Sequence, residues 1–118
     1  MPLTVTQPLG RLPTFPELQD LARQHEVGIN GSEQAGSFHH PDPEHPKVKG
    51  HYSIEQNGEI RGDFTSNLIG KLTGTFVFKA GFVEITITEK PFLLPEAVLK
   101  LKLTEALEEF CARFSPGT

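Results

Sequence analysis

The segment from Lys49 to Lys90 alternates apolar and polar residues around two glycine-containing turns, a pattern typical of antiparallel strands. In its first hairpin, a three-residue loop that ends at Gly58 pairs Ile54 with Ile60 and keeps one face apolar. A two-residue loop would instead place Ile54 opposite Arg61. We therefore predict a type I turn with a glycine bulge.

A second hairpin follows, with strands expected over Lys71–Lys79 and Phe82–Glu89. Here a two-residue turn at Ala80-Gly81 is the consistent choice, because it pairs Phe78 with Val83 on one apolar face. A further short strand is expected over residues 35–39. Together these segments predict a meander sheet with one apolar face.

Two amphipathic helices flank this sheet in the sequence. The first is expected over residues 14–26, because Thr14 and Glu17 form a capping box ahead of an apolar stripe. The second starts at Pro95 and runs to about Phe114, with charged residues opposite its stripe. The apolar stripe of this second helix comprises Leu99, Leu103, Leu107, Phe110, Cys111 and Phe114. Leu94, Val98 and Leu101 are expected to widen it near its start.

The predicted fold class is α+β, with an antiparallel three- to five-stranded meander sheet and both helices packed on one face. The 118 residues suit a single domain over 1–118, with an irregular arm over 1–13 and a His/Pro-rich loop over 30–50. The lone Cys111 excludes an internal disulfide and is expected to be a small buried hydrophobe.

Charge and hydropathy exclude several classes of function. The net charge of −4 disfavours nucleic-acid binding, which depends on Lys and Arg. No apolar run approaches the ~20 residues of a transmembrane segment, and nothing marks the N-terminus for export. We therefore expect a cytoplasmic location.

The candidate metal ligands are concentrated in the His/Pro-rich loop, where His39, His40, Asp42 and His45 could bind zinc. However, the prolines at 41, 43 and 46 hold neighbouring ligands apart along an extended chain. The spacing also matches no established metal motif. The alternative interpretation is a stiff, hydrophilic surface loop without a cofactor.

An apolar connector between the last strand and the last helix is the candidate binding surface, formed by Phe92, Leu93, Leu94 and Val98. One interpretation is a linker that clamps the helix to the sheet. The other is an exposed patch for a protein partner, an apolar ligand or a second subunit.

Charged residues of the first hairpin offer a weaker candidate for catalysis. His51, Glu55, Arg61 and Asp63 alternate onto the face opposite Tyr52. We expect these side chains to be solvated cross-strand pairs rather than general acids and bases. No catalytic residue is predicted.

The C-terminal half resembles a known family. The stretch Gly74–Ile87, the connector Lys90–Leu94 and the last helix are similar to the small bacterial polyhydroxyalkanoic acid system proteins, over residues 14–27 and 60–112. The loop over 30–50 has no match there, and Lys90-Pro91-Phe92 stands where that family tends to have Leu-Gly. The resemblance implies a small non-catalytic protein found with polyester-granule genes, and it transfers no catalytic residue.

The sequence thus predicts a non-enzymatic binding or interaction protein that acts through an apolar sheet and helix surface, with a homodimer as its expected assembly. The alternative is a metal-binding protein or a metal-assisted enzyme that uses the loop histidines His39, His40 and His45.

Overall fold

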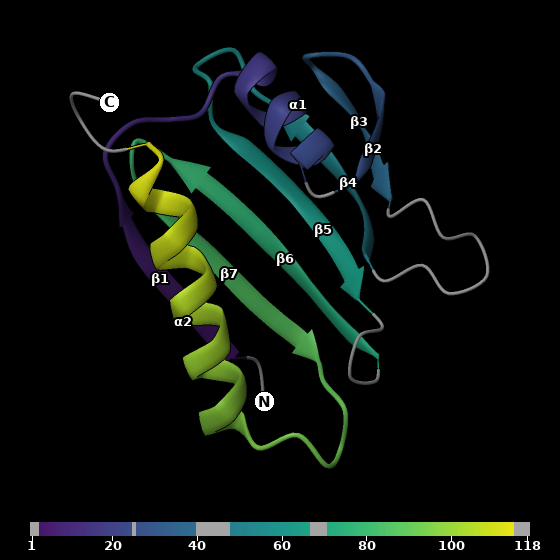
Figure 1. Ribbon diagram of the computed structural model, residues 1–118, viewed down its shortest axis with the longest axis vertical. Coiled ribbons are helices and arrows are strands. Elements are labelled where there is room, and N and C mark those ends of the chain that lie inside the picture. Colours follow the sequence, from purple (N-terminus) through teal and green to yellow (C-terminus); the bar gives the residue numbers. More distant parts are fainter. Residues whose placement is uncertain (1–2, 25, 40–47, 67–70, 115–118) are drawn as a thin grey trace.

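The computed structural model describes residues 3–24, 26–39, 48–66 and 71–114 (Figure 1). The chain has the predicted α+β class. In order, its elements are β1 (Leu3–Leu9), α1 (Phe15–Gln24), β2 (Gly28–Gly31), β3 (Ala35–His39), β4 (Val48–Ile54), β5 (Ile60–Ser66), β6 (Leu72–Lys79), β7 (Gly81–Glu89) and α2 (Glu96–Ala112). Over these ranges, no helix combines the length and apolar character needed to cross a membrane.

The strands form one seven-stranded antiparallel sheet in the order β1-β7-β6-β5-β4-β3-β2. Strands β2 to β7 are consecutive neighbours and make a meander, whereas β1 pairs with β7 and forms the opposite edge. The expectation of three to five strands in a single meander is therefore wrong in detail, because it omits β1 and β2.

The prediction of an irregular arm over residues 1–13 is wrong, because this segment contains strand β1. Leu3, Val5 and Leu9 alternate onto the inner face, and Val5 and Leu9 are buried. Pro8 obscured this pattern, yet it lies opposite Phe82 in an edge strand, where a missing N–H group is tolerated.

The predicted loop over 30–50 also holds more strand than expected. Strand β3 occupies the expected Ala35–His39, but the loop range also includes the end of β2 and the start of β4. Strand β2 has four residues, two of them glycine, and is too short to show alternation. Residues 40–47 lie outside the described residues.

The registers predicted for both hairpins are confirmed. Ile54 pairs with Ile60, and the Glu55 N–H donates to the Glu59 carbonyl at 2.8 Å, while Gly58 takes the positive φ of 90° that closes a bulged turn. In the second hairpin, Phe78 pairs with Val83 as predicted.

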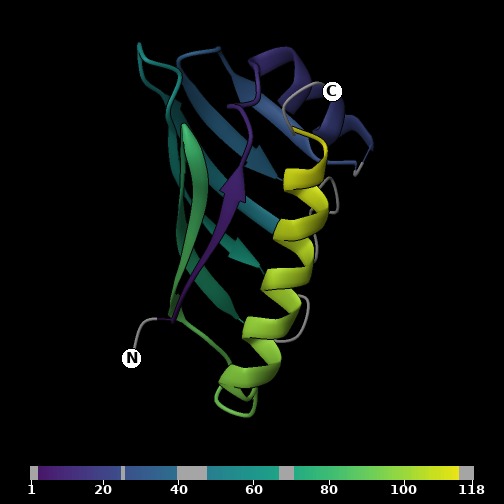
Figure 2. The same ribbon diagram turned by 90° about the vertical axis from the view of Figure 1, so that its left-hand side faces the viewer.

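The two helices lie on the same side of the sheet, as Figure 2 shows. Helix α1 begins with the expected capping box: the Thr14 N–H donates to Glu17 Oε1 at 2.9 Å, and the Glu17 N–H donates to Thr14 Oγ1 at 3.4 Å. Within the ranges that the structure describes, no helix lies over the opposite face of the sheet (Figure 2).

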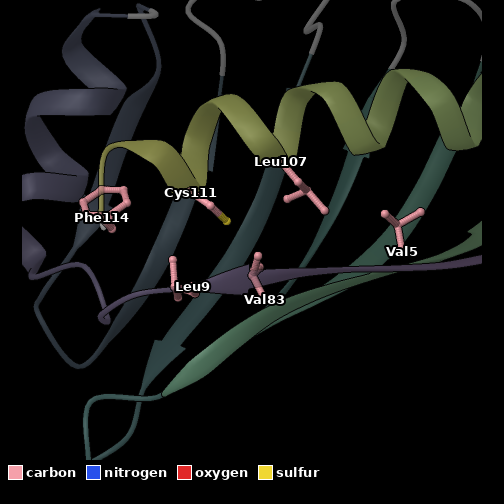
Figure 3. Packing of buried hydrophobic residues seen from close by; sticks show 6 residues of the cluster. All are labelled: Val5, Leu9, Val83, Leu107, Cys111 and Phe114. Carbon is pink, nitrogen blue, oxygen red and sulfur yellow. The ribbon is translucent and has the colours of Figure 1, made fainter. Parts of the chain in front are cut away.

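Helix α2 packs against β1 and contributes three buried residues to the core, Leu99, Leu107 and Cys111. Figure 3 shows the main cluster between α2 and strands β1 and β7: Val5, Leu9, Val83, Leu107, Cys111 and Phe114. Cys111 is buried as predicted, and burial raises the pKa of its thiol. The expectation that Val98 and Leu101 widen the buried stripe is wrong, since they are 44% and 58% exposed.

Candidate functional site

The predicted zinc ligands fall mostly outside the described residues. His39 ends β3 opposite Gly28, whereas His40, Asp42 and His45 lie in 40–47. In the part of the chain that the structure describes, no three His, Cys, Asp or Glu side chains are grouped to hold a metal ion. The zinc site therefore stays a prediction.

The charged residues of the first hairpin lie on the outer face, opposite Tyr52, as the alternation predicts. His51 Nδ1 is 3.3 Å from Asp63 Oδ1, and Arg61 Nε donates to Glu55 Oε1 at 2.9 Å. The His51–Asp63 pair links β4 to β5 in solvent, where such pairs contribute little stability.

The structure divides the apolar connector into two parts. Phe92 is 96% exposed and Leu93 is 89% exposed, and Val98 on α2 is also exposed. Leu94 instead packs against the buried cluster of Leu72, Ile87 and Leu99. The clamp interpretation therefore applies to Leu94 alone.

The sequence did not reveal the most distinctive feature, an apolar cavity of about 350 Å³ between α1 and the inner face of the sheet. The helix contributes one wall through apolar side chains, and the strands contribute the floor. The lining residues are Phe15, Leu18, Leu21, Ala22, Val27, Ile29, Phe38, Tyr52, Ile60, Phe76 and Phe78.

Glycines on the inner face lower this floor. A Cβ atom at Gly50 would lie 2.6 Å from Phe38 Cζ, and one at Gly62 would lie 2.8 Å from Phe76 Cε1. Only glycine lets each ring rest on the backbone of the neighbouring strand at these positions. At Gly36, a Cβ atom would lie 2.7 Å from the Tyr52 hydroxyl oxygen. The rings therefore lie against the sheet and leave room above it.

The floor is continuous with the core under α2 through a row of aromatic rings. The ring centroids of Phe38 and Phe76 are 6.1 Å apart, those of Phe76 and Phe78 are 5.6 Å apart, and those of Phe78 and Phe110 are 5.3 Å apart. Such edge and tilted contacts are the favoured geometries of aromatic pairs. The floor is thus held in place from the α2 side.

Helix α1, in contrast, contains no buried residue although its apolar side faces the cavity. Polar contacts hold both of its ends. At its start, Arg11 donates two hydrogen bonds to the Glu17 carboxylate, at 2.8 and 2.6 Å. At its end, Gln24 accepts a hydrogen bond from Arg113 Nη1 of the chain that follows α2, at 3.1 Å.

Arg11, which follows β1, contacts both α1 and the residues after α2. Its backbone N–H donates to the Phe114 carbonyl at 3.0 Å, and its guanidinium lies 5.2 Å from the centre of the Phe114 ring. The Arg11 hydrogen bond, helped by the Thr14 backbone, lowers the pKa of Glu17 to about 2. Glu17 is therefore ionised at any ordinary pH, and the ion pair stays formed.

Among the described residues that line the cavity, Tyr52 alone carries a hydroxyl group. This hydroxyl donates to the Ser32 carbonyl at 2.6 Å, and burial raises its pKa. The tyrosine is thus neutral, and its hydroxyl proton is donated to the Ser32 carbonyl. The described lining residues can hold an apolar molecule, and none of them provides an ionised group for acid or base chemistry.

The fold and this site define an α+β protein with a helix-covered apolar cavity. No protein-family model matches the chain, and no curated protein or solved structure matches it significantly.

Proposed function

We propose that this protein is a non-enzymatic binding protein that takes up a small apolar molecule between α1 and the sheet. The observation that supports this proposal is the lining: in the part of the chain that the structure describes, every side chain around the cavity is apolar except that of Tyr52, whose hydroxyl is bonded to Ser32. Water gains few hydrogen bonds in such a space. The volume of about 350 Å³ lies within the range of small-molecule sites.

The volume indicates how much of a ligand the cavity can hold. An apolar cavity of roughly 150 Å³ holds benzene, with six carbon atoms. In proportion, the 350 Å³ here accommodates about 14 non-hydrogen atoms. We therefore propose a single aromatic ring system or a medium-length aliphatic chain as the ligand class.

The chain offers a built-in reporter for this site. It has one tyrosine, Tyr52, and no tryptophan, so all intrinsic fluorescence above 270 nm excitation arises inside the cavity wall. Titration with N-phenyl-1-naphthylamine should give saturable energy transfer from Tyr52 to the probe. A linear, unsaturable signal would show that the probe does not enter a defined site.

A cavity-filling variant provides the decisive comparison. Ala22→Phe places a ring in the cavity from the α1 side, and we expect it to weaken probe binding about tenfold or more. The matched control is Ala106→Phe, which makes the same change at an exposed position of α2. Equal affinity in the two variants, with unchanged melting temperatures, would contradict the proposal.

The resemblance to the polyhydroxyalkanoic acid system proteins supports a ligand from polyester-granule systems. A medium-chain 3-hydroxyalkanoate ester is therefore the second probe in the same titration. The predicted homodimer is a separate proposal, which light scattering of the purified chain tests directly.

A further inference from the structure

The turn between β7 and α2 presents two apolar side chains directly to solvent. Phe92 is 96% exposed and Leu93 is 89% exposed. The turn itself is ordered: the Leu94 N–H donates to the Pro91 carbonyl at 3.1 Å, and Lys90 Nζ donates to the Leu94 carbonyl at 2.9 Å. With Leu94 anchored in the core, Phe92 and Leu93 are held outward without a packing role.

The charge around this turn differs from that of the whole chain. Four lysines and two glutamates occupy the adjoining ends of β6 and β7 and the first two turns of α2, whereas the chain as a whole carries a net charge of −4. One glutamate, Glu89, is 3.8 Å from a lysine, Lys71. The lysines are Lys71, Lys90, Lys100 and Lys102, and the glutamates are Glu89 and Glu96. The acidic residues Glu105, Glu108 and Glu109 lie further along α2.

We propose that this end of the molecule docks on an anionic lipid surface, with Phe92 and Leu93 inserted among the acyl chains and the lysines near the headgroups. Apolar side chains framed by lysines are the arrangement that interfacial binding requires. On α2, Leu101, which stands between Lys100 and Lys102, is also 58% exposed.

A lipid surface fits the turn between β7 and α2 better than a protein partner does. A standard protein interface buries about 800 Å² on each side, whereas an aromatic side chain supplies roughly 150–250 Å². Phe92 and Leu93 alone therefore fall well short of a stable protein contact. A bilayer needs no complementary shape, and each lysine near an anionic surface strengthens binding about fivefold.

The position of the turn keeps this surface separate from the cavity. Figure 1 shows the connection from β7 to α2 at the opposite end of the long axis from α1. Docking would therefore leave α1 facing away from the lipid. The inference goes beyond the proposed ligand binding and does not depend on it.

Vesicle co-sedimentation of the full chain tests the inference. We expect binding to phosphatidylcholine vesicles that contain phosphatidylserine, with weakening at high salt and little binding to phosphatidylcholine alone. The double variant Phe92→Ser/Leu93→Ser should bind about a hundredfold more weakly, at an unchanged melting temperature, since both side chains are exposed. Lys100→Gln/Lys102→Gln should bind about 25-fold more weakly.

The matched control is Lys79→Gln, which removes a lysine at the other end of β6 and should leave vesicle binding unchanged. Wild-type protein that stays in the supernatant at low salt would overturn the inference. So would an equal loss in the Lys79 variant, which would indicate unspecific charge attraction. If light scattering shows a dimer that Phe92→Ser/Leu93→Ser dissociates, and vesicles do not bind, the occupant is a second copy of the chain.

Discussion

Replacing Gly62 with alanine tests whether the inner-face glycines form the cavity floor. Gly62 lies in β5 between Tyr52 of β4 and Phe76 of β6. A Cβ atom there would overlap the His51 carbonyl oxygen and the Phe76 ring. Overpacking of this kind costs about 1–3 kcal/mol, and the upper end applies because a strand backbone cannot rotate aside. Alanine in a strand offsets about 1 kcal/mol of that cost through lower chain entropy. We therefore expect Gly62→Ala to lower the free energy of unfolding by about 2 kcal/mol.

Urea denaturation followed by circular dichroism measures this change. With a slope of about 1.5 kcal/mol/M, a loss of about 2 kcal/mol lowers the midpoint by roughly 1.3 M. The matched control is Gly28→Ala at the edge of the sheet, where the nearest atom is His39 Cε1 at 3.2 Å, on a side chain that can move. Gly28→Ala should stay within about 0.5 kcal/mol of wild type. If both variants unfold at the same midpoint, the glycines do not set the floor and our account of the cavity is wrong.

Two further predictions concern the covering helix. The folded-state pKa of Glu17, about 2, lies below its ordinary value of 4.5, so the stabilisation from its ion pair with Arg11 is complete above about pH 4.5 and is lost as the pH falls through 2. Affinity for N-phenyl-1-naphthylamine should therefore hold between pH 7 and 5 and fall only in strong acid. The variant Glu17→Gln keeps the capping geometry, and we expect it to bind N-phenyl-1-naphthylamine weakly at every pH. An affinity equal to that of the wild type would disprove a role for the ion pair. Secondly, native-state hydrogen exchange should show α1 amides opening well before those of α2, since α1 buries no residue and α2 buries three. Equal protection of the two helices would contradict the idea of a loosely packed cover.

Local geometry explains why the hairpins could be predicted from the sequence. In each hairpin, one loop length places apolar residues on a common face, and a shift by one residue would bury charge, as the rejected pairing of Ile54 with Arg61 shows. The helices could also be predicted from the sequence, because Thr14 and Glu17 fix the start of α1 and the apolar stripe of α2 repeats at helical spacing. These features depend on residues close together in the sequence.

The remaining features depend on contacts between distant segments. Strand β1 pairs with β7, which is far away in the sequence. In addition, Pro8 interrupts the alternation that would mark a strand. The cavity joins Phe15, Ile29 and Phe76, and alternation shows only that such residues face inward, not whether they fill the space between them. One signal was present: glycines at inward positions, such as Gly50 and Gly62, each pair with an aromatic residue on a neighbouring strand. That pattern indicates rings lying flat on a sheet.

The contrast between the two helices links stability to the proposed function. The apolar side of α2 is already covered by strands, so α2 stays in place with or without a ligand. The apolar side of α1 faces the cavity, and a bound apolar molecule would complete its burial. If the protein binds ligand as proposed, ligand binding and burial of the α1 face are one equilibrium, in which a ligand at a hundred times its Kd adds about 2.7 kcal/mol to the folded state. Most of that gain should appear as slower exchange of the α1 amides, because this helix gains the most contacts.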